Sequence, residues 1–260
     1  MPLTYWSYLK LDELLSLQQP VSEGPEHDEM LFIIIHQVYE LWFKEVIHEL
    51  DYLQESLRNG DLPSALHTLK RILTILKTLV AQIDVLETMT PLEFLTFRER
   101  LETGSGFQSH QFRELEFILG LKDKRVIDRY PRDSESRRHL EARYAQAGLW
   151  DAFLAYLVRA GYDFPPQVLK RDVTLPIVPA PEVQDVLIEV YRNDPAIREL
   201  CERLVDFDEG VQEWRYRHVK MVQRTIGTKP GTGGSAGADY LKTTLFQPAF
   251  PDLWEIRAHF

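Results

Sequence analysis

The sequence predicts an all-α protein, and three observations lead to this prediction. Apolar residues recur at intervals of three and four over long stretches, beginning with 27–58, which is the spacing of a buried helix face. Helix start and stop signals bracket these stretches. Almost no stretch alternates between apolar and polar residues and ends in hairpin turns, as a strand would. We therefore expect a single domain over 1–260, built as a helical bundle.

The composition narrows the class of protein. The chain has 260 residues, 44% of them hydrophobic, and a formal net charge of −10. We therefore expect a sizeable core and no nucleic-acid partner, because such partners need a basic surface. The single cysteine, Cys201, excludes an intrachain disulfide and a cysteine-based zinc site. No uncharged apolar run approaches the roughly 20 residues of a membrane helix, and the first residues lack a signal-peptide pattern. A cytoplasmic setting without membrane contact is the expectation.

The first two long helices have clear boundaries. A helix over 27–58 ends at Asn59-Gly60, because glycine commonly follows the last residue of a helix. Asp61 opens the next helix, with Pro63 in its first turn. The apolar stripe of this second helix consists of Leu66, Leu69, Leu73, Leu76 and Val80.

A shorter pair of helices follows. Thr90 and Glu93 form a capping box. The helix that starts there carries Phe94, Phe97, Arg98 and Leu101. The glycines of 104–106 then break the chain, and we predict a helix over 107–119 with Gly120 at its carboxyl end.

The middle of the chain has weaker patterns. The segment 122–138 is highly charged, so we expect it on the surface. A helix is predicted over 149–160. The segment 163–181 holds five prolines and is expected to be an ordered crossing loop. A new helix begins at about Glu182.

The last long helix leads into the strongest functional signal. We predict it over 194–226, with Gly210 as a candidate for a bend. It carries His218 among basic and aromatic residues and runs into a loop with five glycines over 227–237. A helical histidine suits a metal-ligand role, and a glycine-rich loop can fold over a ligand with free backbone N–H groups. Each pattern alone is more often structural.

The candidate site residues come from three helices. Phe32 and His36 are four residues apart, so they share a face of the first long helix. Arg98 and His218 lie on other helices. A pocket between helices, lined by aromatic rings and a few polar groups, is typical of cofactor sites in bundles. Two histidines facing a flat cofactor suggest haem, with one bound to the iron. No CxxCH motif is present, so the haem would be non-covalent.

Each of these residues also has a structural interpretation. His36 follows three isoleucines and could be a core histidine, and Arg98 could pair with Glu102 on the surface. The cluster 27–29 could bind a divalent metal, but consecutive helical residues do not face one point. The loop 229–237 is not a phosphate-binding loop, because it lacks Gly-Lys-Ser/Thr and follows a helix.

Taken in order, several segments resemble the tryptophan 2,3-dioxygenase family. The resemblance spans nearly the whole chain and weakens only over about 122–181. It outweighs the core interpretation of His36, because several long motifs occur in the right order. The matching segments are 3–9, 27–50 (HDEMLFIIIHQVYELWFKEVIHEL), 94–98, 104–109 (GSGFQS), 214–241 (WRYRHVKMVQRTIGTKPGTGGSAGADYL) and 250–254.

The resemblance implies a b-type haem, bound without a covalent link. His218 would be the proximal iron ligand, and His36 would lie on the distal side. Ser105 and Gly106 would line the edge of the haem. The haem would thus lie between helices of the bundle.

The resemblance also implies roles in binding L-tryptophan. His36 would bond to the indole N–H, and Phe32 would pack on the indole ring. Arg98 would grip the carboxylate with two parallel hydrogen bonds, which suits a planar guanidinium. Thr232 would contact the ammonium. Phe94 departs from some relatives that carry a tyrosine hydroxyl there, and we expect only a small effect on binding.

The resemblance further implies an assembly. Members of the family are tetramers built as dimers of dimers, in which the amino-terminal segment of one subunit completes the neighbour's pocket. Tyr5, Tyr8 and Leu9 would then contribute to the site of another copy. The aromatic character of this segment agrees with burial against a partner.

The expected reaction inserts both atoms of O2 across the indole C2=C3 bond of L-tryptophan, giving N-formyl-L-kynurenine. One alternative is a related haem enzyme that acts on another indole or aromatic amino acid, for example as a monooxygenase. A second alternative, from another class, is a non-catalytic haem sensor or carrier. Such a carrier would not need Arg98 and Thr232 as substrate contacts.

Overall fold

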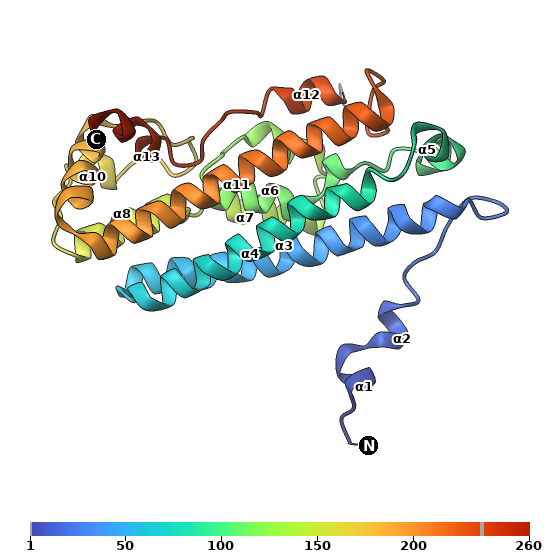
Figure 1. Ribbon diagram of the computed structural model, residues 1–260, viewed down its shortest axis with the longest axis horizontal. Helices are drawn as coiled ribbons and strands as arrows, with labels where there is room; N and C mark the ends of the chain where they lie inside the picture. Colours follow the sequence, from blue (N-terminus) through green and yellow to red (C-terminus); the bar gives the residue numbers. More distant parts are fainter. Residues whose placement is uncertain (1, 235–236) are drawn as a thin grey trace.

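The computed structural model describes residues 2–234 and 237–260, and within these ranges every regular element is a helix. Three long helices lie side by side and form the body of the molecule (Figure 1). These are α3 (His27–Asn59), α4 (Leu62–Leu86) and α11 (Pro195–Ile226). The all-α prediction is confirmed.

The ends of the long helices follow from local chemistry. The helix α3 ends at Gly60, whose φ of 78° places it in the left-handed region that favours glycine. The Asp61 side chain then accepts a hydrogen bond from the Ser64 N–H and caps α4. The Asp194 side chain caps α11 in the same way, accepting from the N–H groups of Ala196 and Ile197.

The core lies where these three helices meet. Leucines and isoleucines of α3 and α4, such as Leu50, Leu53 and Ile72, are fully buried there. The helix α11 runs without a break through Gly210. A Cβ atom at Gly210 would lie 2.5 Å from Leu76 Cδ2, so the glycine permits the close approach of α11 to α4. Close packing accounts for this glycine, which the sequence analysis had assigned to a candidate bend.

Shorter helices surround this core. Around the long helices lie α5 (Pro91–Arg98), α6 (His110–Ile118), α7 (Glu135–Tyr144), α8 (Leu149–Arg159), α10 (Pro181–Asn193) and α13 (Pro251–Glu255). Single-turn helices and 3-10 turns complete the chain: α1 (Tyr5–Leu9), α2 (Leu11–Leu14), α9 (Pro166–Leu169), α12 (Ala238–Lys242), η1 (Glu99–Leu101), η2 (Gly106–Gln108), η3 (Lys124–Arg129) and η4 (Ile256–His259).

Two predictions of detail were wrong, and a third was incomplete. The helix predicted over 107–119 is split, because the Ser109 side chain accepts from the Phe112 N–H and starts α6 at His110. The crossing loop over 163–181 contains the short α9. The segment 122–138 is not wholly on the surface, because Lys122 is buried.

Lys122 shows why charge alone did not predict exposure. Its ammonium donates to the backbone carbonyls of Arg143, Tyr144 and Gln146, at the carboxyl end of α7. These three acceptors satisfy the group, which a buried charge requires. Burial lowers the pKa of Lys122 to about 8.

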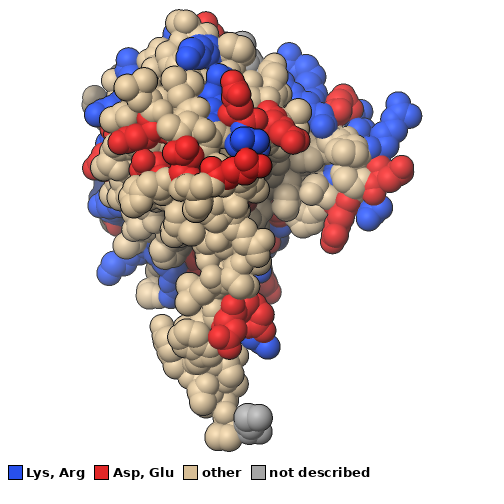
Figure 2. Space-filling model, turned by 90° about the vertical axis from the view of Figure 1, so that its right-hand side faces the viewer, with Lys and Arg blue, Asp and Glu red and all other residues tan. Residues whose placement is uncertain are grey.

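The first residues form an arm that projects from the body (Figure 1). Its side chains are largely uncharged (Figure 2). Tyr5 is 76% exposed and Tyr8 is 69% exposed, and Trp6 and Leu9 are exposed as well. No helix in the described ranges combines the length and the hydropathy needed to cross a membrane.

Candidate functional site

A cavity of about 250 Å³ opens between α3, α5, α6 and α11. Most of its wall is apolar, and aromatic rings such as Phe32, Phe43 and Phe112 form much of it. The loop around 104–106 and the glycine-rich loop close one side. An apolar, concave site with a few polar groups is the usual form of a cofactor or substrate pocket.

His36 projects into this cavity from α3. Its Nδ1 lies 2.7 Å from the carbonyl oxygen of Phe32, one turn earlier. Because a carbonyl only accepts, Nδ1 carries the hydrogen and Nε2 is left as an acceptor. Burial lowers the pKa of His36, against the opposing effects of the Phe32 carbonyl and Glu40, and favours the neutral ring.

His218 enters the cavity from α11. Its ring is stacked on Trp214, with centroids 5.1 Å apart and planes 7° from parallel. Burial lowers the pKa of His218 to about 4, and His36 and Arg113 add to the effect. The imidazole is therefore neutral at physiological pH, and a neutral ring nitrogen is a good metal ligand. No hydrogen bond to this ring is made by residues 2–234 or 237–260.

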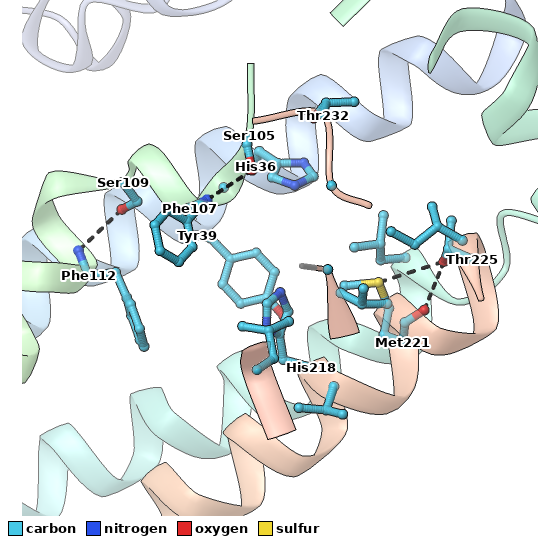
Figure 3. A pocket seen from close by; sticks show the side chains of 18 of the residues that line it. His36, Tyr39, Ser105, Phe107, Ser109, Phe112, His218, Met221, Thr225 and Thr232 are labelled. Atoms are coloured by element: carbon cyan, nitrogen blue, oxygen red, sulfur yellow. Dashed lines mark hydrogen bonds between the residues drawn. The ribbon is translucent and has the colours of Figure 1, made fainter. Parts of the chain in front are cut away.

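The two histidines lie on opposite sides of the cavity (Figure 3). His36 comes from the first long helix and His218 from the last. Both side chains line the same cavity of about 250 Å³.

An aromatic wall surrounds His36. The Phe32 ring lies 4.1 Å from the His36 ring, centroid to centroid, and 5.8 Å from Phe94. Phe97 completes the group, 5.5 Å from Phe32. Phe94 and Phe97 are buried. This wall suits a flat apolar ring.

Arg98 brings a positive charge to the same side. One terminal nitrogen donates to the Pro230 carbonyl at 2.7 Å and ties α5 to the glycine-rich loop. Its Nε is buried and has no acceptor among the described residues. The alternative of a surface pair with Glu102 does not hold, because the Arg98 side chain donates to Pro230 instead. A buried donor without a partner at a cavity wall points to a ligand acceptor.

The glycine-rich loop packs against the 104–106 loop. The Thr232 hydroxyl donates to the Gly104 carbonyl at 2.5 Å. A Cβ atom at Gly233 would lie 2.7 Å from Ser105 Cβ, so glycine permits this contact. Thr232, Ser105 and Gly106 all line the cavity. Ser235 and Ala236, which belong to the predicted loop, lie outside the described residues.

Three predicted residues do not reach this cavity within one chain. Tyr5, Tyr8 and Leu9 are on the arm, away from the body (Figure 1). The cluster 27–29 is not a metal site either, because Glu29 accepts hydrogen bonds from the N–H groups of Val21 and Ser22. Within the described ranges, no group of three or more His, Cys, Asp or Glu residues could hold a metal ion.

The sequence analysis missed several cavity residues. One signal could have found Trp214, because it precedes His218 by four residues as Phe32 precedes His36. The others are brought to the cavity by tertiary packing and carry no local signal: Tyr39, Glu40, Phe43, Phe112, Arg113, Glu116 and Arg215.

The fold and the cavity define an all-helical protein whose buried pocket lies between two helical histidines. The family model of tryptophan 2,3-dioxygenase matches residues 1–160 and 180–260. The tryptophan 2,3-dioxygenase of Herpetosiphon aurantiacus is 60% identical over 98% of both chains. Those of Anaeromyxobacter sp. strain K and Caulobacter vibrioides are 60% and 44% identical, over 98% of this chain and 95% and 97% of theirs. The chain belongs to the tryptophan 2,3-dioxygenase family.

Proposed function

We propose that the chain is a haem-dependent dioxygenase that converts L-tryptophan and O2 into N-formyl-L-kynurenine, the first step of tryptophan breakdown. The observation that carries the proposal is the single cavity that holds His218, His36 and Arg98. It combines a metal ligand, an acceptor for an indole N–H and a donor for a carboxylate. The named relatives, similar over nearly their whole length, support the same reaction.

The cavity residues fit a non-covalent b-type haem. His218 offers a neutral nitrogen in an apolar wall, which suits an axial ligand. Ser105 and Gly106 lie at the wall where an edge of the group would pass. When bound, the haem supplies the activation of O2, and the protein supplies ligation, orientation and exclusion of water.

The substrate side of the cavity orients the amino acid. Nε2 of His36 accepts the indole N–H, because the Phe32 carbonyl holds the proton of this ring on Nδ1. Phe32 packs on the indole ring. The free Nε edge of Arg98 grips the carboxylate. The Thr232 hydroxyl donates its hydrogen bond to the Gly104 carbonyl, so its oxygen keeps lone pairs that can accept from the substrate ammonium. Phe94 adds apolar contact only.

We also infer the assembly and the setting. The exposed aromatic residues of the arm support a homotetramer, a dimer of dimers, in which Tyr5, Tyr8 and Leu9 complete the site of a neighbouring copy. A free, buried Cys201 agrees with a cytoplasmic setting. The core that joins α3 and α4 to α10 and α13 supports one domain over 1–260.

The test is the absorption spectrum of the reduced protein with and without L-tryptophan, followed by O2. We expect tryptophan to perturb the haem bands and a kynurenine-type absorbance to grow. A haem spectrum that does not change when tryptophan is added would favour a non-catalytic haem sensor or carrier. Turnover with labelled O2 adds a second check, because one labelled atom in the product would mean a monooxygenase.

A further inference from the structure

A buried cluster of charged side chains forms part of the cavity wall, apart from the residues assigned above. Arg113 and Glu116 lie on α6, and Arg215 faces them from α11. A terminal nitrogen of Arg113 donates to one Glu116 oxygen at 2.6 Å, and one of Arg215 donates to the other at 2.8 Å. Each of the three residues is at most 9% exposed. One carboxylate thus serves two guanidinium groups, and one positive charge remains.

In this cluster, Arg113 has a hydrogen-bond donor without an acceptor among the described residues. Its Nε is buried and has no acceptor within 2–234 and 237–260. Its guanidinium carbon lies 4.7 Å from the Phe107 ring centroid and 5.4 Å from that of Phe112. These rings and Glu116 hold the guanidinium in place, so its free edge is fixed at the cavity wall. Arg215 differs, because its second terminal nitrogen donates to the Thr244 carbonyl.

The other carboxylate of the cavity does not satisfy Arg113. Glu40 projects from α3, and its Oε2 accepts from the Gln111 side chain at 2.8 Å. No hydrogen bond joins Glu40 to Arg113 in the described part of the chain. The cavity therefore holds two separate free guanidinium edges, one at Arg98 on α5 and one at Arg113 on α6.

The free guanidinium edges of Arg98 and Arg113 are separate, so a single ligand carboxylate does not satisfy both. A buried positive charge without a counterion is unfavourable, and guanidinium pairs best with a planar carboxylate. The substrate amino acid has a single carboxylate, which the proposed function assigns to Arg98. An iron porphyrin of the b type carries carboxylate side chains of its own.

We propose that Arg113, held by Glu116 and with Arg215 behind it, is a second carboxylate subsite that binds an acidic side chain of the porphyrin. This inference rests on the proposed function, because it assigns Arg98 to the substrate. It adds a charged anchor to a cofactor site that His218 alone would otherwise hold by a single bond.

The experiment compares two porphyrins in the full-length apoprotein. One is iron protoporphyrin IX, and the other is its dimethyl ester, in which the carboxylates are neutral. The rate of loss of each porphyrin to an excess of a haem-scavenging protein gives its relative retention. A charge-assisted hydrogen bond predicts that wild type retains the free acid about 10- to 150-fold better than the ester.

Arg113→Met should abolish this preference, with the retention of the free acid falling to that of the ester. Arg113→Lys should keep part of it, because lysine retains the charge but not the planar pair of donors. Arg129→Met is the matched control. Arg129 also lies over Phe107, at 3.9 Å, but it is exposed and does not line the cavity, so its variant should keep the full preference.

Three results would overturn the subsite. These are equal retention of both porphyrins by wild type, an Arg113→Met variant whose retention of both porphyrins equals that of wild type, and one whose retention of both falls by the same factor, so that the preference for the free acid stays. If Arg113→Met does not fold, judged by its circular dichroism, Arg113→Lys decides, and an unchanged preference there overturns the subsite. Failure of wild type to bind either porphyrin would instead overturn the proposed function together with the subsite.

Discussion

The two long helices that face the cavity carry the same sequence pattern but offer different chemistry. Phe32 precedes His36 on α3 by four residues, and Trp214 precedes His218 on α11 by four. On α3 the imidazole is tilted 40° to its aromatic neighbour and its Nδ1 is bonded to a backbone carbonyl. On α11 the imidazole lies flat on the indole ring. The spacing places the ring pair, but local bonds decide which nitrogen is free.

The residues around the two histidines differ as well, and they form two different walls of the cavity. The substrate wall (Phe32, His36, Phe94, Arg98) combines aromatic rings with an uncommitted guanidinium edge. The cofactor wall (Trp214, His218, Val219, Val222) is apolar around its histidine, and burial there lowers the pKa of His218 to about 4. We infer that the substrate wall binds a ligand with polar groups, while the cofactor wall offers a neutral imidazole nitrogen to a metal.

The largest effect is expected from His218→Ala, which removes the proposed iron ligand of the cofactor wall. Purified protein should lose most of its haem and its activity, because the only bond from the protein to the iron is lost. The ratio of haem absorbance to protein measures this. His110→Ala, on α6 and outside the cavity, is the control and should keep its haem. Full haem content and normal turnover in His218→Ala would refute the assignment.

Substitutions of Arg98 test whether the substrate wall recognises the carboxylate of an amino acid. Arg98→Lys should weaken L-tryptophan binding about 10- to 150-fold, because a charge-assisted hydrogen bond and the fork geometry are lost. Arg98→Leu should weaken it at least as much. The Kd of L-tryptophan is compared with that of an indole analogue that lacks the carboxylate, which should hardly change. Equal weakening of both ligands would mean that Arg98 supports the loop through Pro230.

His36→Ala sharpens the contrast between the two histidines. The variant should keep its haem, because the proposed iron ligand, His218, lies on the other wall. Turnover should fall about 2- to 13-fold, the scale of one hydrogen bond to a neutral group. Haem content and kcat are both measured. If His36→Ala loses its haem while His218→Ala keeps it, the two histidines have the opposite roles to those proposed.

The fold was largely predictable because its helices carry their own boundary signals. Gly60, Asp61 and Asp194 act in the structure as their positions in the sequence indicated. The start of α6 was misjudged, because the competing caps at Ser105 and Ser109 are decided by side-chain hydrogen bonds. The burial of Lys122 depends on carbonyls more than twenty residues away, and periodicity does not report such contacts.

The candidate site was predictable in part, and for a different reason. The pairs on α3 and α11 were visible as spacing, but only the resemblance to a family brought His36, Arg98 and His218 together. The cluster of Arg113, Glu116 and Arg215 had no such signal. Arg215 is ninety-nine residues from Glu116, and a charged residue on a helix is usually solvated.

The smallest effect is expected from the arm, which would add to the substrate wall of another copy. Its exposed rings, Tyr5 and Tyr8 among them, lie on a helix that the reciprocal bonds of Thr4 and Ser7 keep formed. Deleting 1–9 should remove an apolar contact of about 1 kcal/mol and no charge, so the Kd of L-tryptophan should rise about 5-fold. The haem should stay, because His218 is untouched. Light scattering at decreasing concentration should show a looser oligomer. Val178→Ala changes an equally exposed apolar residue on the body and should leave both quantities unchanged. A monomer with full activity after the deletion would show that each chain builds its substrate wall alone.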